Sequence, residues 1–196
     1  MNLRFEQLHG ADIERHIDAL AALRIAVFRD WPYLYEGTRE YEKRYLQTYL
    51  QCPRSLAILV WDGEACIGAS TVQPLADAPI DMQQPFIDAG MDLSKIDYFG
   101  ESVLLRAYRG QGLGVKFFEY REAHARALGL STCAFCAVQR SDNDARRPQD
   151  YVPNDVFWTK RGYRKEPQLR TTLNWPDVGE SVSSDKPMTF WLREIA

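Results

Sequence analysis

No stretch of this 196-residue sequence is apolar enough to cross a membrane. Its apolar runs are short, as in Leu56 to Trp61, whereas a membrane-spanning helix needs about 20 apolar residues. The first residues, Met1 to Glu6, contain an arginine and a glutamate and are too polar for a secretory signal peptide. We therefore expect a cytoplasmic protein without a membrane partner.

The sequence also lacks an excess of positive charge. Its 24 Lys and Arg residues are outnumbered by 27 Asp and Glu residues, which gives a net charge of −3. Proteins that bind nucleic acid neutralise its phosphates with a clearly basic face. The composition therefore argues against such a face, and we expect no nucleic-acid partner.

Cysteine and histidine are scarce, with four and three residues. Cys133 and Cys136 have the CxxC spacing of some zinc and redox sites. They lie in a predicted strand, however, where residues three apart point to opposite faces. No second CxxC and no nearby histidine pair accompanies them. We therefore predict free thiols and no bound metal.

Hydrophobic patterning predicts a mixture of strands and helices, typical of an α/β (α+β) protein. Asp12 and Thr38 are N-cap candidates, because apolar residues recur at helical spacing after each of them. Asp62-Gly63 predicts a hairpin turn between two strands. Because hairpins accompany strand–helix–strand units, the sheet should be mixed. Strands are predicted at residues 3–8, 55–61, 65–72, 98–105, 132–138, 169–174 and 188–193, and later helices at 113–128 and 154–161.

A chain of this length is typical of one domain, so we expect residues 1–196 to form a single domain. Residues 74–96 show no regular period but carry apolar side chains such as Phe86 and Met91. We interpret them as an irregular insertion or lid. Residues 139–153 are polar, include two prolines and are expected to form a long loop.

The stretch from Leu104 to Val115 is the most informative part of the sequence. A predicted strand ends there, a glycine-rich loop follows, and a helix begins at once. Glycines allow a ligand to approach the backbone closely. The free N–H groups of a first helical turn bind anions such as a pyrophosphate.

Three ligand-binding patterns compete for this loop. A dinucleotide-binding GxGxxG motif is not matched, because Gly114 stands one position too early for the third glycine. A P-loop is not matched either, because its Lys-Ser/Thr pair is missing. The pattern Arg-x-x-Gly-x-Gly is matched by Arg109, Gly112 and Gly114. A glycine turn that binds nothing is the plain alternative.

The matched pattern resembles the coenzyme A loop of the GNAT (Gcn5-related N-acetyltransferase) superfamily, including the preceding Tyr108. A second block, Phe157 to Tyr163, is similar to the helix-to-strand segment of that family. The predicted order of elements also matches the family along nearly the whole chain. The resemblance implies a mixed, twisted β-sheet flanked by helices and splayed between its fourth and fifth strands.

The resemblance further implies an acetyl-CoA-dependent N-acetyltransferase, in which a neutral amine attacks the thioester directly. Acetyl-CoA is then the co-substrate, and the acceptor is a small-molecule or peptide amine. The alternative is a GNAT-like module that binds acyl-CoA as a sensor or scaffold without catalysis, and a homodimer is left open. The residues that the resemblance assigns to the cofactor are Val103, Leu104, Leu105, Arg109, Gly110, Gln111, Gly112, Leu113, Gly114, Val115 and Trp158.

Glu101 is the candidate for the base or water relay that removes the ammonium proton. Strand alternation places it on the same face as Phe99, Val103 and Leu105, and burial among them would raise its pKa. Two other interpretations of Glu101 are open. Its carboxylate either lies at the exposed start of the strand or pairs with an arginine.

Trp158 occupies the position where the family commonly has a tyrosine that protonates the leaving thiolate. Because an indole has no transferable proton, the alternatives are Tyr151, Tyr163, Cys136 or solvent. Three aromatic residues follow the first predicted helix, where the family often builds its acceptor pocket. They either line such a pocket or close the core: Trp31, Tyr33 and Tyr35.

Overall fold

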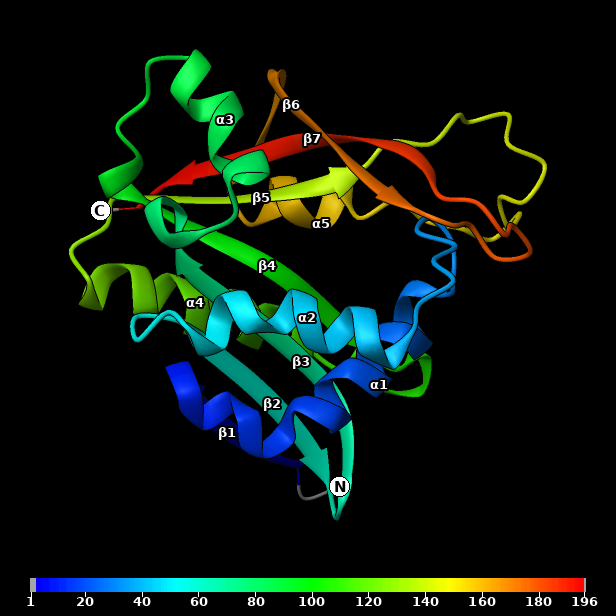
Figure 1. Ribbon diagram of the computed structural model, residues 1–196, viewed down its shortest axis with the longest axis horizontal. Helices are drawn as coiled ribbons and strands as arrows, with labels where there is room; N and C mark the ends of the chain where they lie inside the picture. The colour runs from blue at the N-terminus through cyan, green and yellow to red at the C-terminus, as the bar shows by residue number, and fades with distance from the viewer. Residues whose placement is uncertain (1–2, 196) are drawn as a thin grey trace.

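The computed structural model describes residues 3–195, which form a seven-stranded sheet with helices on both faces (Figure 1). The strand order is β1-β2-β3-β4-β5-β7-β6, and every neighbouring pair is antiparallel except β4 and β5. This arrangement confirms the mixed sheet. The strands are β1 (Leu3–His9), β2 (Leu56–Asp62), β3 (Ala65–Pro74), β4 (Ile96–Leu104), β5 (Thr132–Val138), β6 (Arg164–Trp175) and β7 (Ser184–Glu194).

The helices cover the sheet from two sides. Leu59 of β2 packs toward α1 and α2, whereas Ile58 and Val60 pack toward α4. Because both faces are covered, β2 is continuously apolar rather than alternating. Within residues 3–195, no helix is long and apolar enough to cross a membrane. The helices are α1 (Ile17–Phe28), α2 (Arg39–Leu50), α3 (Ile80–Asp88), α4 (Leu113–Ala127) and α5 (Asp155–Lys160), with 3-10 turns η1 (Gly10–His16), η2 (Leu75–Asp77), η3 (Leu93–Lys95) and η4 (Arg106–Tyr108).

The first two helices begin in different ways. Thr38 caps α2 as predicted, since its side-chain oxygen accepts the backbone N–H of Tyr41 at 3.3 Å. The predicted N-cap at Asp12 is wrong, because this residue lies inside the 3-10 turn η1. His16 then leaves the helical region, with φ −127° and ψ 18°, and α1 begins only at Ile17. The apolar residues at helical spacing therefore lie first in a 3-10 turn, η1, and then in an α-helix, α1.

The segment between β3 and β4 contains the helix α3, flanked by the short turns η2 and η3. Its buried residues Met82 and Phe86 lie one helical turn apart, and the Phe86 ring is edge-on to Phe190 of β7 at 4.8 Å between centroids. The expectation of irregular structure here is wrong. Pro85 inside the helix and the exposed Ile80 conceal the helical period in the sequence. The interpretation as an insertion stays a prediction.

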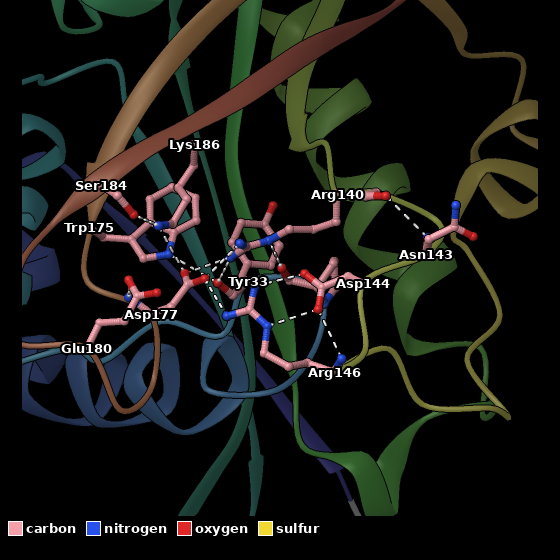
Figure 2. A network of polar contacts seen from close by, with 12 residues as sticks. Tyr33, Arg140, Asn143, Asp144, Arg146, Trp175, Asp177, Glu180, Ser184 and Lys186 are labelled. Carbon is pink, nitrogen blue, oxygen red and sulfur yellow. Dashed lines mark hydrogen bonds and ion pairs between the residues drawn. The ribbon is translucent and has the colours of Figure 1, made fainter.

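A buried ion cluster around Asp177 joins the loop 139–153 to β7 (Figure 2). The Asp177 carboxylate accepts two hydrogen bonds of 2.8 Å from Arg140 and one of 2.8 Å from Arg146, and it lies 3.2 Å from Lys186 Nζ. Burial by itself would raise the pKa of Asp177. The hydrogen bonds from these three cations outweigh burial and lower the pKa to about 2.

Arg140 also connects this cluster to the chain that follows α1. Its Nε donates to the Pro32 carbonyl at 2.8 Å, and its Nη2 donates to the Tyr33 carbonyl at 2.7 Å. Trp175 of β6 donates its indole N–H to the same Tyr33 carbonyl at 3.1 Å. The chain after α1, the loop 139–153 and the β6–β7 hairpin are thus fixed to one another.

Asp177→Asn should lower the free energy of unfolding by about 3–5 kcal/mol, because it leaves the largely buried Arg140 and Lys186 without their counter-charge. The folded pKa of Asp177, about 2, lies below the value of about 3.9 for an unfolded chain. Its stabilisation is therefore present above about pH 4 and is lost as the pH falls through 2.

Urea unfolding at several pH values measures both effects, and the difference between wild type and variant should shrink toward pH 2. Asp142→Asn is the control, because Asp142 is exposed and pairs only at the surface with Arg147. It should cost less than about 1 kcal/mol. Equal stabilities of wild type and Asp177→Asn at pH 7 would contradict the prediction.

Candidate active site

The candidate site lies where β4 and β5 separate (Figure 1). Their parallel pairing comprises three residue pairs and ends at Tyr98 and Ala134. Beyond this point β4 stays paired with β3, and β5 stays paired with β7. We call the two separated arms, residues 99–104 and 135–138, the fork. The implied splay is confirmed, and among the described strands none pairs with β4 on its fork edge.

A β-bulge interrupts the β4 arm of the fork. The pairing with β3 slips between Ser70 and Val72, so that Gly100 and Glu101 of β4 together oppose the single residue Thr71. The backbone N–H of Glu101 donates to Thr71 Oγ1 at 3.3 Å. The extra residue changes the direction of every side chain that follows it.

The bulge reverses the alternation of side chains along β4. Phe99 packs against α4, whereas Glu101 and Val103 face α1 and α2. The prediction that Glu101 shares a face with Phe99 is therefore wrong, and its shared face with Val103 is confirmed. Leu105 contacts the cores on both faces. One added residue shifts a period-two pattern by one position.

Gly100 is required in the bulge because α2 lies directly against it. A Cβ at this position would lie 1.7 Å from Tyr49 Oη and 2.7 Å from Thr71 Oγ1. The Tyr49 hydroxyl is 3.4 Å from the hydroxyl of Tyr45, one helical turn earlier. The absent side chain therefore allows α2 to bring two tyrosine hydroxyls to the bulge.

Glu101 is buried and paired with an arginine. Its Oε2 lies 2.6 Å from Arg24 Nη1 of α1 and accepts a hydrogen bond from the Tyr45 hydroxyl at 3.3 Å. The carboxylate is therefore not at an exposed strand start. Burial raises the pKa of Glu101, Arg24 lowers it and Glu42 raises it again, so that the pKa lies above the usual value for a glutamate.

The glycine-rich loop connects β4 to α4. Gly110 and Gly112 have positive φ angles of 77° and 82°, and a Cβ at either would meet nothing within 4 Å. Gly112 is the N-cap of α4, and among the described residues no side chain caps the first turn. Arg109 Nε donates to the Leu104 carbonyl at 3.1 Å and fastens the loop to β4. An open backbone and free helical N–H groups suit an anion such as a pyrophosphate.

Trp158 lies on α5 beside the β5 arm of the fork. Its half-buried ring packs edge-on against Phe135 of β5, at 5.0 Å between centroids, and against Trp191 of β7, at 5.1 Å. The preceding Phe157 reaches the first turn of α4, where a Cβ on Gly114 would lie 3.5 Å from its ring. The structure thus brings the two sequence blocks side by side.

The three residues considered, beside solvent, as alternatives to the family's tyrosine lie in different places. Tyr163 is buried on the α4 face, and its hydroxyl donates to a glutamate of α4 at 3.2 Å. Tyr151 belongs to the loop 139–153. Of the three, only Cys136 is part of the fork, with its Sγ 3.5 Å from the Tyr98 hydroxyl. Its thiol is free, and burial raises the pKa of Cys136 to about 11.

The aromatic residues after α1 lie beside the C-terminal hairpin. The Tyr33 ring packs against Phe28 of α1 at 4.5 Å and against Trp175 of β6 at 6.0 Å between centroids. Tyr35 is buried, whereas Trp31 and Tyr33 are half-buried. Tyr35 therefore closes the core, and the other two rings stay partly accessible.

Sequence reasoning missed two members of the site, Arg24 and Glu42, and the role of the Tyr45 hydroxyl. The signal for Arg24 is a single charge inside the otherwise apolar run 19–28. Because an unpaired charge on a buried helix face is costly, such a residue requires an acidic partner. Tyr45 belongs to an aromatic series at helical spacing, which by itself indicates only a core face.

Sequence comparison relates the chain to one family. The sequence pattern of the acetyltransferase (GNAT) family matches residues 20–148. No curated protein sequence matches the chain.

Solved structures of similar fold cover nearly the whole chain. An N-acetyltransferase from Staphylococcus aureus Mu50 is 11% identical, with a TM-score of 0.61 over 99% of both chains. An aminoglycoside 6'-N-acetyltransferase complexed with coenzyme A is 13% identical, with a TM-score of 0.59 over 98% of this chain and 97% of that one. An acetyltransferase from Thermus thermophilus is 15% identical, with a TM-score of 0.55 over 100% of this chain and 98% of that one. At these identities the likeness shows the fold alone.

Gly100→Ala should destabilise the protein by about 3 kcal/mol, the upper end of the usual cost of overpacking, because the Tyr49 hydroxyl or the bulge must move. Tyr49→Phe removes the closest contact, so the double variant should lose less stability than the two single losses added together. Urea unfolding of the four proteins measures this coupling.

Gly114→Ala is the matched control for the added methyl group. Its Cβ would meet Phe157 at an ordinary 3.5 Å, and alanine is preferred to glycine in a helix by about 1 kcal/mol. This variant should be as stable as wild type or more stable. Strictly additive losses in the Gly100 and Tyr49 variants would show that the two residues do not compete for space.

Proposed function

Because the chain belongs to the GNAT acetyltransferase family, we propose that it is an acetyl-CoA-dependent N-acetyltransferase acting on a primary amine. The course of β4 carries this proposal. The strand leaves β5 after Tyr98, keeps a free edge along the fork and runs through η4 into the glycine-rich loop before α4. An extended ligand with an anionic end would find backbone partners along this single path.

The residues of this path fit coenzyme A. In the proposal, the loop 109–115 holds the pyrophosphate through the backbone N–H groups of residues 110–114, because those of Arg109 and Val115 are bonded within the chain. The edge of residues 103–105 pairs with the pantetheine arm. The open space at Gly110 and Gly112 and the unpaired edge of β4 support this assignment. Trp158 borders the other arm through its contact with β5. When bound, acetyl-CoA would supply the thioester that the amine attacks.

Glu101 is the proposed proton acceptor of the reaction. An amine that attacks a thioester must lose a proton, and a base works best when its pKa lies near the working pH. The raised pKa of Glu101 moves this carboxylate toward that range. Since Glu101 faces α1 and α2, the acceptor amine, from a small molecule or a peptide, would approach from that side of the sheet.

Solvent is the proposed proton donor to the leaving thiolate. Trp158 has no transferable proton. The Cys136 thiol, with a pKa of about 11, is a weaker acid than an ordinary thiol with a pKa of about 8.5. Tyr163 is already bonded to Glu122 on the α4 face.

Gly112→Ala should weaken coenzyme A binding at least about tenfold, a change of about 1.4 kcal/mol, because a methyl group would stand where the phosphate approaches the backbone. The folded protein should tolerate the change, since the Cβ meets open space and the left-handed backbone costs about 1–2 kcal/mol. Isothermal titration calorimetry with coenzyme A measures the affinity. Gly129→Ala, with φ +70° and open space at the other end of α4, controls for strain and should bind normally. Normal binding by Gly112→Ala would place the pyrophosphate elsewhere.

Glu101→Gln should keep coenzyme A affinity but lower turnover by about 10²–10⁴, the usual contribution of a positioned base. The loss should shrink as the pH rises, because more of the amine is then already neutral. Release of free thiol from acetyl-CoA in the presence of pooled primary amines measures turnover. Near-native turnover of Glu101→Gln at pH 7 would remove Glu101 from the mechanism.

The same assay tests the proposed function itself. Amine-dependent thiol release by the wild-type protein is the expected result. A wild-type protein that binds acetyl-CoA and releases no thiol with any amine would support the alternative, a module that binds acyl-CoA without catalysis.

A further inference from the structure

Arg24 is shared between two buried carboxylates. Its Nη1 lies 2.6 Å from Glu101 Oε2, and its Nε donates to Glu42 Oε2. The side chains of Arg24, Glu42 and Glu101 are 8%, 0% and 1% exposed, so solvent does not screen their charges. We call these three residues the triad. They come from α1, α2 and β4, and only the packing of these elements brings them together.

The triad contains one more acidic group than basic group. Each of its carboxylates also has one buried oxygen, Glu42 Oε1 or Glu101 Oε1, with no partner at normal hydrogen-bond geometry among the described residues. The hydroxyls of Tyr35 and Thr71, which face Glu42 and Glu101 respectively, are neutral and do not offset the charge. Buried polar atoms nearly always have a partner, because an unpaired one is costly. Uptake of one proton would remove the excess negative charge and supply a missing donor. The triad is therefore suited to accept one proton.

The other groups that face Glu101 do not balance this charge. Tyr45 and Tyr49 of α2 and Thr71 of β3 are neutral hydroxyls, and burial raises the pKa of both tyrosines. Arg121 of α4 reaches the Glu101 carbonyl oxygen, at 3.4 Å, rather than the carboxylate. Among the described residues, Arg24 is thus the only cation that contacts the Glu101 carboxylate.

We propose that Arg24 and Glu42 are positioning residues that make Glu101 the proton acceptor of the transfer reaction. Arg24 fixes the Glu101 carboxylate, while Glu42 occupies another N–H of the same guanidinium and leaves Glu101 incompletely neutralised. This inference rests on the proposed function, because it concerns the proton that the acceptor amine loses. Burial raises the pKa of Glu101, Arg24 lowers it and Glu42 raises it again, in agreement with these roles.

Tyr45 provides the route for the proton. Its hydroxyl donates to Glu101 Oε2 at 3.3 Å, and its side chain is half-buried while Glu101 is sealed from solvent. As the nitrogen–carbon bond forms and the carbon–sulfur bond breaks, the amine proton moves to the Tyr45 oxygen and the Tyr45 proton moves to Glu101. Tyr45 is unchanged, Glu101 ends protonated, and the thiol group leaves as a thiolate. The proton then returns from Glu101 through the Tyr45 hydroxyl to solvent, and solvent protonates the thiolate.

Glu42→Gln tests the positioning role through the pH dependence of kcat/KM. The acid limb of this profile is the fall in kcat/KM at low pH, where the base becomes protonated. Removing one negative charge should weaken proton binding by Glu101, so the acid limb should move to lower pH by about one to three units. Glu42→Asp keeps the charge and should restore the wild-type limb. Glu40→Gln, at an exposed position of the same helix, is the matched control and should leave the limb in place. A Glu42→Gln variant that loses activity without any movement of the limb would overturn the proposal.

Carbon-13 NMR of the glutamate carboxyl groups gives a second readout, which needs neither activity nor a folded Glu42→Gln variant. In the wild-type protein the resonance of Glu101 should titrate above the usual range of a glutamate, because burial and the neighbouring Glu42 favour its neutral form. The variant Glu101→Gln assigns this resonance. A Glu101 resonance that titrates in the usual range would overturn the proposal. Failure of the proposed function has a different signature, with a raised Glu101 titration but no amine-dependent thiol release.

Discussion

The short parallel contact between β4 and β5 is the constraint on which the candidate site depends. Three residue pairs join the strands, and beyond them each strand is bonded to a different neighbour, β3 or β7. The twist of each half-sheet then carries the arms apart, because no ladder of hydrogen bonds opposes it. As a result β4 supplies a free backbone edge among the described strands, a buried carboxylate and the approach to the glycine-rich turn before α4.

The bulge decides which groups meet at the fork. A carboxylate on a buried strand face and an arginine in an apolar helix are each costly alone. They are tolerated because the slip opposite Thr71 turns Glu101 toward α1, where Arg24 lies 2.6 Å away. Gly100 is part of the same solution, since it leaves room for the tyrosine hydroxyls of α2. The bulge in β4 and the buried ion pair between Glu101 and Arg24 therefore depend on each other.

Signals contained within a few residues predicted local structure correctly. Thr38 caps its helix, the hairpin follows Asp62, and α4 begins at Leu113, directly after the glycine-rich loop. Features that depend on distant partners were not predictable. The face of Glu101 is set by its pairing with another strand, and alternation assigned it partly wrongly. The identity of its partner, Arg24, depends on how α1 packs on the sheet, which no local pattern records.

The ion cluster at Asp177 has a mechanical consequence for the fork. The chain after α1 belongs to the half of the molecule built on β1–β4, whereas Asp177 and Lys186 belong to the half built on β5–β7 (Figure 1). Arg140 bonds both halves at once, through the Tyr33 carbonyl and the Asp177 carboxylate. Spreading the arms would stretch these buried contacts together, so the cluster acts as a strap across the open end. Any movement that widens the fork at this end would therefore have to break buried ion pairs first, which holds the two arms at a set separation.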